Sequence, residues 1–140
     1  RGPHRLERLG RWLDGLETPR RLACMGNHDY EDLSEGEAVA DRVRAAGFDL
    51  LVNRCARLAL PGGDLQIAGL DDMFEGKPCL ETLMAGYGGG LPTVLLCHNP
   101  AQFEAEPGAW GAFPLMLSGH THGGQFRLPL SWTQALVEAK

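Results

Sequence analysis

The chain has 140 residues, of which 44% are hydrophobic, and its formal net charge is −5 at pH 7. This length and composition fit one globular domain with its own core, and they exclude a largely disordered chain. The acidic balance with scattered Lys and Arg argues against a nucleic-acid-binding surface. No signal peptide is visible, and no apolar run approaches the roughly 20 residues that span a bilayer.

The first half of the chain alternates between helical and strand-like segments. Apolar residues recur every three or four positions over 6–16, which predicts a helix that ends near Pro19. A short strand is expected over 21–25, a helix over 34–46 with Gly47 beyond its end, and a strand over 48–52. Strands over 56–60 and 65–70 flank a Pro-Gly-Gly-Asp turn, which predicts a hairpin.

The second half continues the alternation. We expect a short helix over 79–85, a glycine-rich loop over 86–92, a buried strand over 93–97 and a short helix over 100–106. A further buried strand is predicted over 114–118, and an edge strand over 126–130, since Pro129 cannot donate to a ladder. The order predicts a layered α/β fold with a mixed sheet, as a single domain over residues 1–140.

Three polar clusters each follow a predicted buried strand. Ligands of open α/β sheets bind beyond the carboxyl ends of the strands, so we expect the three clusters to meet there. Imidazole, amide and carboxylate groups together suit borderline divalent metal ions. Each cluster alone also fits a hydrogen-bonded loop or an Asx turn, but together they predict a metal site. The residues concerned are Asn27, His28, Asp29, His98, His120 and His122.

These clusters carry a family resemblance. "GNHD" at 26–29, a single histidine after an apolar strand, and "GHTH" at 119–122 resemble the later motifs of the calcineurin-like metallophosphoesterases. "GHTHGGQ" and "IAGLDD" are most similar to a bacterial branch of phosphodiesterases and pyrophosphatases. The resemblance covers nearly the whole chain. It implies a four-layer α/β/β/α sandwich in the intact family, of which this chain would hold an incomplete part.

The resemblance also implies a metal-dependent hydrolase with a two-metal site that cleaves a phosphodiester or a pyrophosphate. Asn27, His98 and His120 would be ligands of one ion, and His122 would be a ligand of the other. Mixed nitrogen and oxygen ligands admit manganese, iron, zinc, nickel or cobalt. The implied substrate is a phosphate ester, lipid-linked or nucleotide-linked.

Two further residues receive catalytic roles from the same resemblance. His28 would protonate the leaving oxygen or stabilise the charged transition state, and Asp29 would orient His28. A non-catalytic scaffold or a one-metal binding module with the same fold is the alternative. The intact His28 and Asp29 favour the enzyme, because a non-catalytic relative has no need of them.

The sequence departs from the family pattern at its start. The family's earlier Asp-x-His motif does not occur, and the one Gly-Asp pair, Gly63-Asp64, lies in the predicted hairpin turn. We therefore expect a piece of a longer protein, truncated at the N-terminus and also at the C-terminus, that is poorly active alone. Its location would be cytoplasmic, or membrane-associated through segments outside these residues.

Several other residues have two interpretations. Asp71 and Asp72 are expected to be turn carboxylates rather than metal ligands. Phe74 and Tyr87 fit contacts with an acyl chain or a base of the substrate, but ordinary packing is the favoured interpretation. The four cysteines form no CxxC pair, so we expect free thiols instead of a disulfide framework.

Overall fold

The computed structural model describes residues 20–30, 33–102 and 110–122, together with residues 8, 11, 12, 14 and 15. The helix predicted over 6–16 and the strand predicted over 126–130 therefore lie outside the described residues, wholly or in most of their length. Most of the helix predicted over 100–106 also lies outside the described residues. So does His4, the one histidine that is not part of the three polar clusters.

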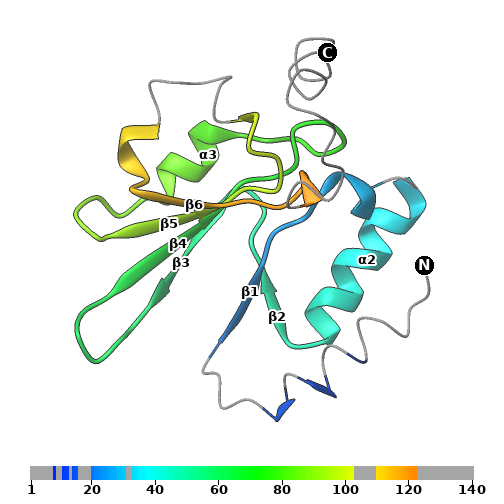
Figure 1. Cartoon of the computed structure of the whole chain (residues 1–140), viewed down its shortest axis with the longest axis horizontal. Coiled ribbons are helices and arrows are strands. Elements are labelled where there is room, and N and C mark those ends of the chain that lie inside the picture. The colour runs from blue at the N-terminus through cyan, green and yellow to red at the C-terminus, as the bar shows by residue number, and fades with distance from the viewer. Residues whose placement is uncertain are drawn as a thin grey trace, which may run out of the picture.

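The described elements follow the predicted order, with ends that differ by at most two residues (Figure 1). Two single turns of 3-10 helix, η1 and η2, were not predicted. The elements are β1 (Arg21–Ala23), η1 (Asn27–Asp29), α2 (Leu33–Ala45), β2 (Phe48–Leu50), β3 (Arg54–Leu58), β4 (Leu65–Gly69), α3 (Leu80–Ala85), β5 (Thr93–Leu96), η2 (Trp110–Ala112) and β6 (Leu115–Leu117).

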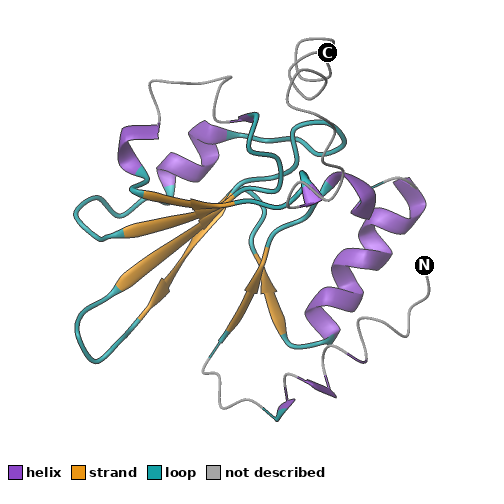
Figure 2. Cartoon of the chain, viewed as in Figure 1, coloured by secondary structure: helices purple, strands orange, loops and turns teal. Residues whose placement is uncertain are grey.

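The described strands form two sheets (Figure 2). β1 and β2 pair in parallel, while the second sheet has the order β3-β4-β5-β6. β3 and β4 are the antiparallel hairpin that the turn sequence predicted, and β4, β5 and β6 run in parallel. The four-stranded sheet is therefore the predicted mixed sheet, and it places the carboxyl ends of three strands at one edge.

Successive side chains of a strand point to opposite faces, so β4 and β5 contribute to a buried cluster on each face of the four-stranded sheet. β6, which was predicted as a buried strand, is instead largely exposed. Ala68 and Leu95 pack with Leu83 of α3 in one buried cluster. Ile67, on the other face, packs with Leu51 in a second cluster, which lies between the two sheets. α2 packs on β2, on the outer side of the two-stranded sheet (Figure 1). The layers therefore follow the α/β/β/α order that the family resemblance implied.

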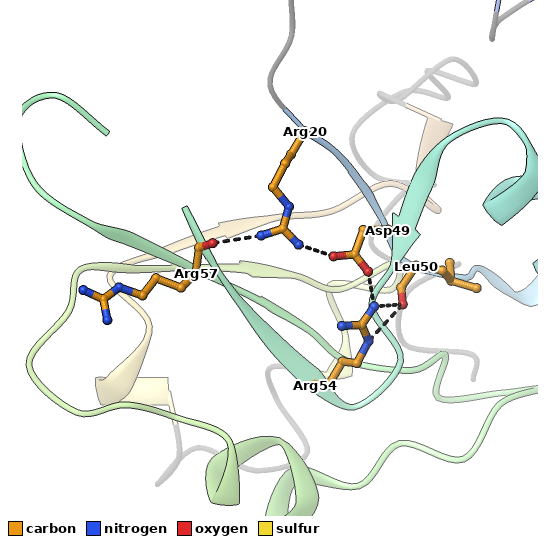
Figure 3. A network of polar contacts seen from close by, with 5 residues as sticks. All are labelled: Arg20, Asp49, Leu50, Arg54 and Arg57. Atoms are coloured by element: carbon orange, nitrogen blue, oxygen red, sulfur yellow. Dashed lines mark hydrogen bonds and ion pairs between the residues drawn. The ribbon is translucent and has the colours of Figure 1, made fainter. Parts of the chain in front are cut away.

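A polar network ties the two sheets together (Figure 3). The Asp49 carboxylate on β2 accepts hydrogen bonds from Arg20, just before β1, and from Arg54 on β3. Arg54 also donates to the Leu50 carbonyl at 2.9 and 3.1 Å, and Arg20 donates to the Arg57 carbonyl at 2.9 Å. One carboxylate thus connects β2 and the start of β1 to β3, so it helps to fix the sheets relative to each other.

Two sequence expectations concern the chain as a whole. All four cysteines are free thiols, as predicted. Among the helices that the structure describes, none has the length and apolar surface needed to cross a bilayer.

Candidate metal centre

The candidate site lies beyond the carboxyl ends of β5 and β6. The parallel ladder continues past both strands, since the Cys97 amide donates to the Leu117 carbonyl at 3.2 Å and the Gly119 amide donates to the His98 carbonyl at 3.0 Å. This pairing holds the two loops side by side. As a result, the rings of His98 and His120 meet edge to face, with centroids 5.3 Å apart and planes at 82°.

Asn27 completes a cluster of three donor groups. Its Oδ1 atom lies 3.0 Å from Nε2 of His98 and 3.3 Å from Nδ1 of His120. Each ring nitrogen is therefore within hydrogen-bonding distance of the amide oxygen, and the tautomer of each histidine sets whether that nitrogen carries a proton. Three polar groups from the ends of β1, β5 and β6 therefore converge, as the strand-end argument predicted.

The local geometry around Asn27 depends on a tight turn at Gly26. The Asp29 amide donates to the Gly26 carbonyl at 3.0 Å, and the Gly26 amide donates to Oδ2 of Asp29 at 2.9 Å. A Cβ atom at Gly26 would lie 2.7 Å from Nδ1 of His98, closer than real contacts allow. Glycine is required here because the backbone approaches the imidazole of a candidate ligand directly.

The "GHTH" loop has an uncommon backbone conformation. His120 has φ of +56° and His122 has φ of +52°, and within the described ranges Asn53 is the only other non-glycine residue with positive φ. The left-handed region is uncommon for residues with a Cβ atom, and such conformations gather at binding and catalytic sites. The predicted bend in this loop is therefore made by the histidines as well as by the glycines that surround them.

Asp71 and Asp72 follow β4 and are buried, at 5% and 0% exposure. Oδ1 of Asp72 accepts hydrogen bonds from the amides of Phe74 and Glu75 at 2.9 and 3.1 Å. Oδ1 of Asp71 accepts a 2.6 Å hydrogen bond from the Tyr30 hydroxyl, which connects this loop to η1. These contacts agree with the expected role as turn carboxylates.

The electrostatic environment at these strand ends is negative. Burial raises the pKa of the Tyr30 hydroxyl, and the hydrogen bond to Asp71 raises it further, so Tyr30 remains a donor. Burial also raises the pKa of the Cys24 thiol, and the charges of Asp29, Asp71 and Asp72 add to that effect. The three carboxylates therefore add negative charge near these strand ends, while burial is the larger cause of the Cys24 shift.

The predicted site residues differ in their surroundings. His28 on η1 and His122 are exposed, whereas Asp29 is half-buried like the three clustered residues. No group of three or more His, Cys, Asp or Glu side chains that could hold a metal ion occurs in the part of the chain that the structure describes. The third donor of the observed cluster is instead the amide of Asn27, and His122 is not part of that cluster.

Two of the three ligand spacings in the cluster are those expected around one divalent ion. Two ligands each about 2.1 Å from an ion, and about 90–109° apart, lie about 3.0–3.4 Å from each other. The separations of 3.0 and 3.3 Å from Oδ1 of Asn27 to the two ring nitrogens match this range. One oxygen and two nitrogen donors suit manganese, iron, zinc, nickel and cobalt.

The favoured interpretation of Phe74 as ordinary packing is wrong, because this residue lies exposed beside the centre. Phe74 is 53% exposed, and its ring centroid lies 5.8 Å from that of His120. Tyr87 instead packs edge to face on Phe113 and donates to the Ala112 carbonyl at 3.2 Å, as the packing interpretation expected. The sequence identified Phe74 only as an aromatic residue of a candidate substrate loop, fit for contact with an acyl chain or a base.

Comparison with known proteins identifies the family. The chain is 34% identical over 122 residues to "Phosphodiesterase YaeI" of Escherichia coli, an alignment that covers 81% of this chain. It is 37% identical over 123 residues, 84% of this chain, to "Uncharacterized metallophosphoesterase YkuE" of Bacillus subtilis. The chain belongs to the calcineurin-like metallophosphoesterases. The comparison thus confirms the family that the sequence motifs predicted.

The match is partial in length. The alignments cover 41% of YaeI and 41% of YkuE, so the chain spans about two fifths of these curated relatives. A third relative, "UDP-2,3-diacylglucosamine pyrophosphatase LpxG" of Chlamydia trachomatis, is 32% identical over 90 residues, 62% of this chain and 25% of that protein. No family model and no solved structure matches this metallophosphoesterase chain.

Proposed function

We propose that this chain forms part of the active centre of a metal-dependent phosphoesterase that hydrolyses a phosphodiester or a pyrophosphate. The observation that carries the proposal is the convergence of Asn27, His98 and His120 with the spacing of metal ligands. The names of YaeI and LpxG support this class of reaction. Because the chain spans about two fifths of YaeI and YkuE, the activity is proposed for the whole protein.

Each proposed metal ligand has a defined part. Asn27, His98 and His120 hold one divalent ion, and His122, whose residue type and motif position suit it, is a ligand of a second. When bound, the ions supply neutralisation of charge on the phosphoryl oxygens and a lowered pKa for a water molecule. The negative environment around Asp71 and Asp72 assists by favouring cations at this edge of the sheet.

His28 is the proposed general acid. It is exposed on η1 and directly follows the proposed ligand Asn27 in the sequence. Its proton goes to the leaving oxygen as the phosphate ester bond breaks. Asp29 is proposed as a positioning residue, because its contact with the Gly26 amide closes the turn that carries both Asn27 and His28.

The test uses the protein encoded by the complete reading frame of the gene. Hydrolysis of bis-p-nitrophenyl phosphate is followed with Mn²⁺ and with EDTA. We expect turnover with Mn²⁺ only, and a loss of about 100-fold or more in His98→Ala and His120→Ala. His28→Ala should lower kcat about 100-fold or more while Mn²⁺ still binds. His4→Ala is the control and should retain full activity.

The alternative predicts a different pattern. A non-catalytic relative would bind Mn²⁺ through the same three residues and show a metal-dependent rise in Tm. It would give no turnover with bis-p-nitrophenyl phosphate or with a pyrophosphate diester such as a nucleoside diphosphate sugar. That result would contradict the proposed activity and leave only a metal-binding function.

A further inference from the structure

Phe74 is a large, exposed apolar side chain that lies beside His120, a proposed metal ligand. Its ring is 53% exposed, and it lies at 41° to the ring of His120 with centroids 5.8 Å apart. An aromatic ring carries a large apolar area, so its exposed face is available to a group bound beside His120. The Phe74 ring lies beside the His120 ring, and about half of the Phe74 side chain stays exposed to solvent.

The loop that carries Phe74 is rigidly held. Oδ1 of Asp72 accepts hydrogen bonds from the amides of Phe74 and Glu75, which fixes the turn at the ring itself. Oδ2 of Asp71 accepts a 2.8 Å hydrogen bond from the Lys77 amide at the far end of the loop. Gly76 closes the loop over Asp71, since a Cβ atom at Gly76 would lie 2.6 Å from that carboxylate. The loop therefore has little freedom to withdraw the ring.

Contacts from outside the loop hold it in position. Oδ1 of Asn53 accepts hydrogen bonds from the amides of Asp71 and Cys79, both at 3.1 Å. Nδ2 of Asn53 donates to the Lys77 carbonyl at 2.8 Å, and the Tyr30 hydroxyl donates to Asp71 at 2.6 Å. Two buried carboxylates, an amide and a hydroxyl thus fix a loop that carries an exposed phenyl ring. This arrangement suits a preformed binding surface, because a rigid ring loses little entropy on contact.

We propose that Phe74 determines specificity by contacting an apolar or aromatic group esterified to the substrate phosphate. The inference rests on the proposed function, which puts the phosphate at the cluster that includes His120. A group attached to that phosphate on the Phe74 side meets the exposed face of the ring. The shared chemistry is a flat or apolar surface, which either a lipid acyl chain or a nucleobase supplies.

The test compares phosphonates that differ only in their apolar group. Methylphosphonate, phenylphosphonate and hexylphosphonate are titrated by calorimetry into the Mn²⁺-loaded protein of the complete reading frame. We expect Phe74→Ala to weaken phenylphosphonate or hexylphosphonate about fivefold to tenfold and to leave methylphosphonate unchanged. A loss of affinity for phenylphosphonate alone identifies a flat partner such as a base. A loss of affinity for hexylphosphonate alone identifies an acyl chain. Phe74→Leu should retain hexylphosphonate affinity in the second case.

Matched controls separate the possible failures. Leu60→Ala removes another exposed apolar side chain, 45% exposed, next to the hairpin turn at the opposite end of the four-stranded sheet, and should change no affinity. Equal weakening of all three phosphonates in Phe74→Ala, together with weaker Mn²⁺ binding, would show that the ring only orients His120 and would overturn the inference. Unchanged affinities would overturn it too. If methylphosphonate does not bind the wild-type protein, the proposed function itself fails.

Discussion

The amide oxygen of Asn27 lies 3.0 Å from Nε2 of His98, although 71 residues separate the two in sequence. Asn27 follows β1 of the two-stranded sheet, and His98 follows β5 of the four-stranded sheet. The candidate metal centre therefore sits across the junction between the sheets. Its geometry depends on whatever holds the sheets together, including the apolar cluster between them and the Asp49 network.

Replacement of Gly26 by alanine should damage the site more than the fold. The added Cβ atom would lie 2.7 Å from Nδ1 of His98, so the imidazole must move away from Asn27. The backbone φ of −120° at Gly26 is open to alanine, so the effect comes from displacement of the His98 ring and not from backbone strain. We expect the free energy of unfolding to change by less than about 1 kcal/mol, while Mn²⁺ affinity falls about tenfold or more.

The matched control for that prediction is Gly62→Ala in the hairpin turn, where a Cβ atom meets nothing within 4 Å. Calorimetric Mn²⁺ titration and urea unfolding should show no change for Gly62→Ala in either quantity. Equal Mn²⁺ affinity in Gly26→Ala and the wild-type chain would mean that His98 is not a ligand in the orientation described.

The Asp49 network should contribute a pH-dependent part of stability. Partial burial of Asp49 would raise its pKa, but the hydrogen bonds and charges of Arg54 and Arg20 outweigh this and lower it. Its contribution is therefore complete above the unfolded pKa of about 3.9 and is lost as pH falls through the lower folded pKa. We expect Asp49→Asn to lower the free energy of unfolding by about 1 kcal/mol at pH 7.

Urea unfolding of the wild-type chain and Asp49→Asn from pH 7 to pH 3 measures this effect. The difference between the two should be constant down to about pH 5 and shrink below it. Asp41→Asn is the control, since its ion pair with Arg44 joins exposed side chains of one helix and should matter little. A difference that persists unchanged at pH 3 would exclude the Asp49 carboxylate as its source.

Thiol reactivity should differ strongly between two cysteines. Burial raises the pKa of Cys97 to about 12, and its thiol donates to Oε1 of Gln102 at 3.1 Å. Hydrogen bonds with Thr82 lower the pKa of Cys79. Because the thiolate is the reactive species, iodoacetamide at pH 8 should label Cys79 first and Cys97 only after unfolding. Mass spectrometry of timed samples checks this, and labelling of Cys97 in the native chain at the Cys79 rate would contradict the described core.

The helix α3 should be held mainly by Leu83. This side chain is fully buried and packs with Ala68 and Leu95 of the four-stranded sheet. Leu83→Ala removes apolar contacts and leaves a cavity, so we expect a loss of about 2–4 kcal/mol in the free energy of unfolding. Leu60→Ala, at a leucine that is 45% exposed, should cost less than about 0.5 kcal/mol. Similar losses for the two variants would mean that α3 does not pack as described.

Local patterns predicted the elements but not every contact between them. The apolar runs, Gly47 and the Pro-Gly-Gly-Asp turn identified strands, a helix end and a hairpin, because each depends on nearby residues. The strand-end argument brought Asn27, His98 and His120 together. The division into two sheets was implied only by the family resemblance, since local patterns do not show which strands pair over long sequence distances.

Other features of the site were equally beyond local patterns. The exposure of Phe74 depends on the shape of a loop fixed by Asn53, Asp71 and Asp72, and the sequence does not reveal which side chains those groups bind. Tyr30 was not expected to contact Asp71 for the same reason. Residue types and motif order predicted which groups form the centre, and the tertiary contacts determine which of them meet.

The most direct test of the metal centre is a Co²⁺ titration of this chain, followed by visible absorption and compared with Asn27→Ala, His98→Ala and His120→Ala. We predict that Co²⁺ binds with imidazole-dependent absorption bands and that each substitution weakens binding about tenfold or more, while His4→Ala binds normally. Equal affinity and equal spectra for the wild-type chain and all three variants would contradict the claim that these residues hold a common ion.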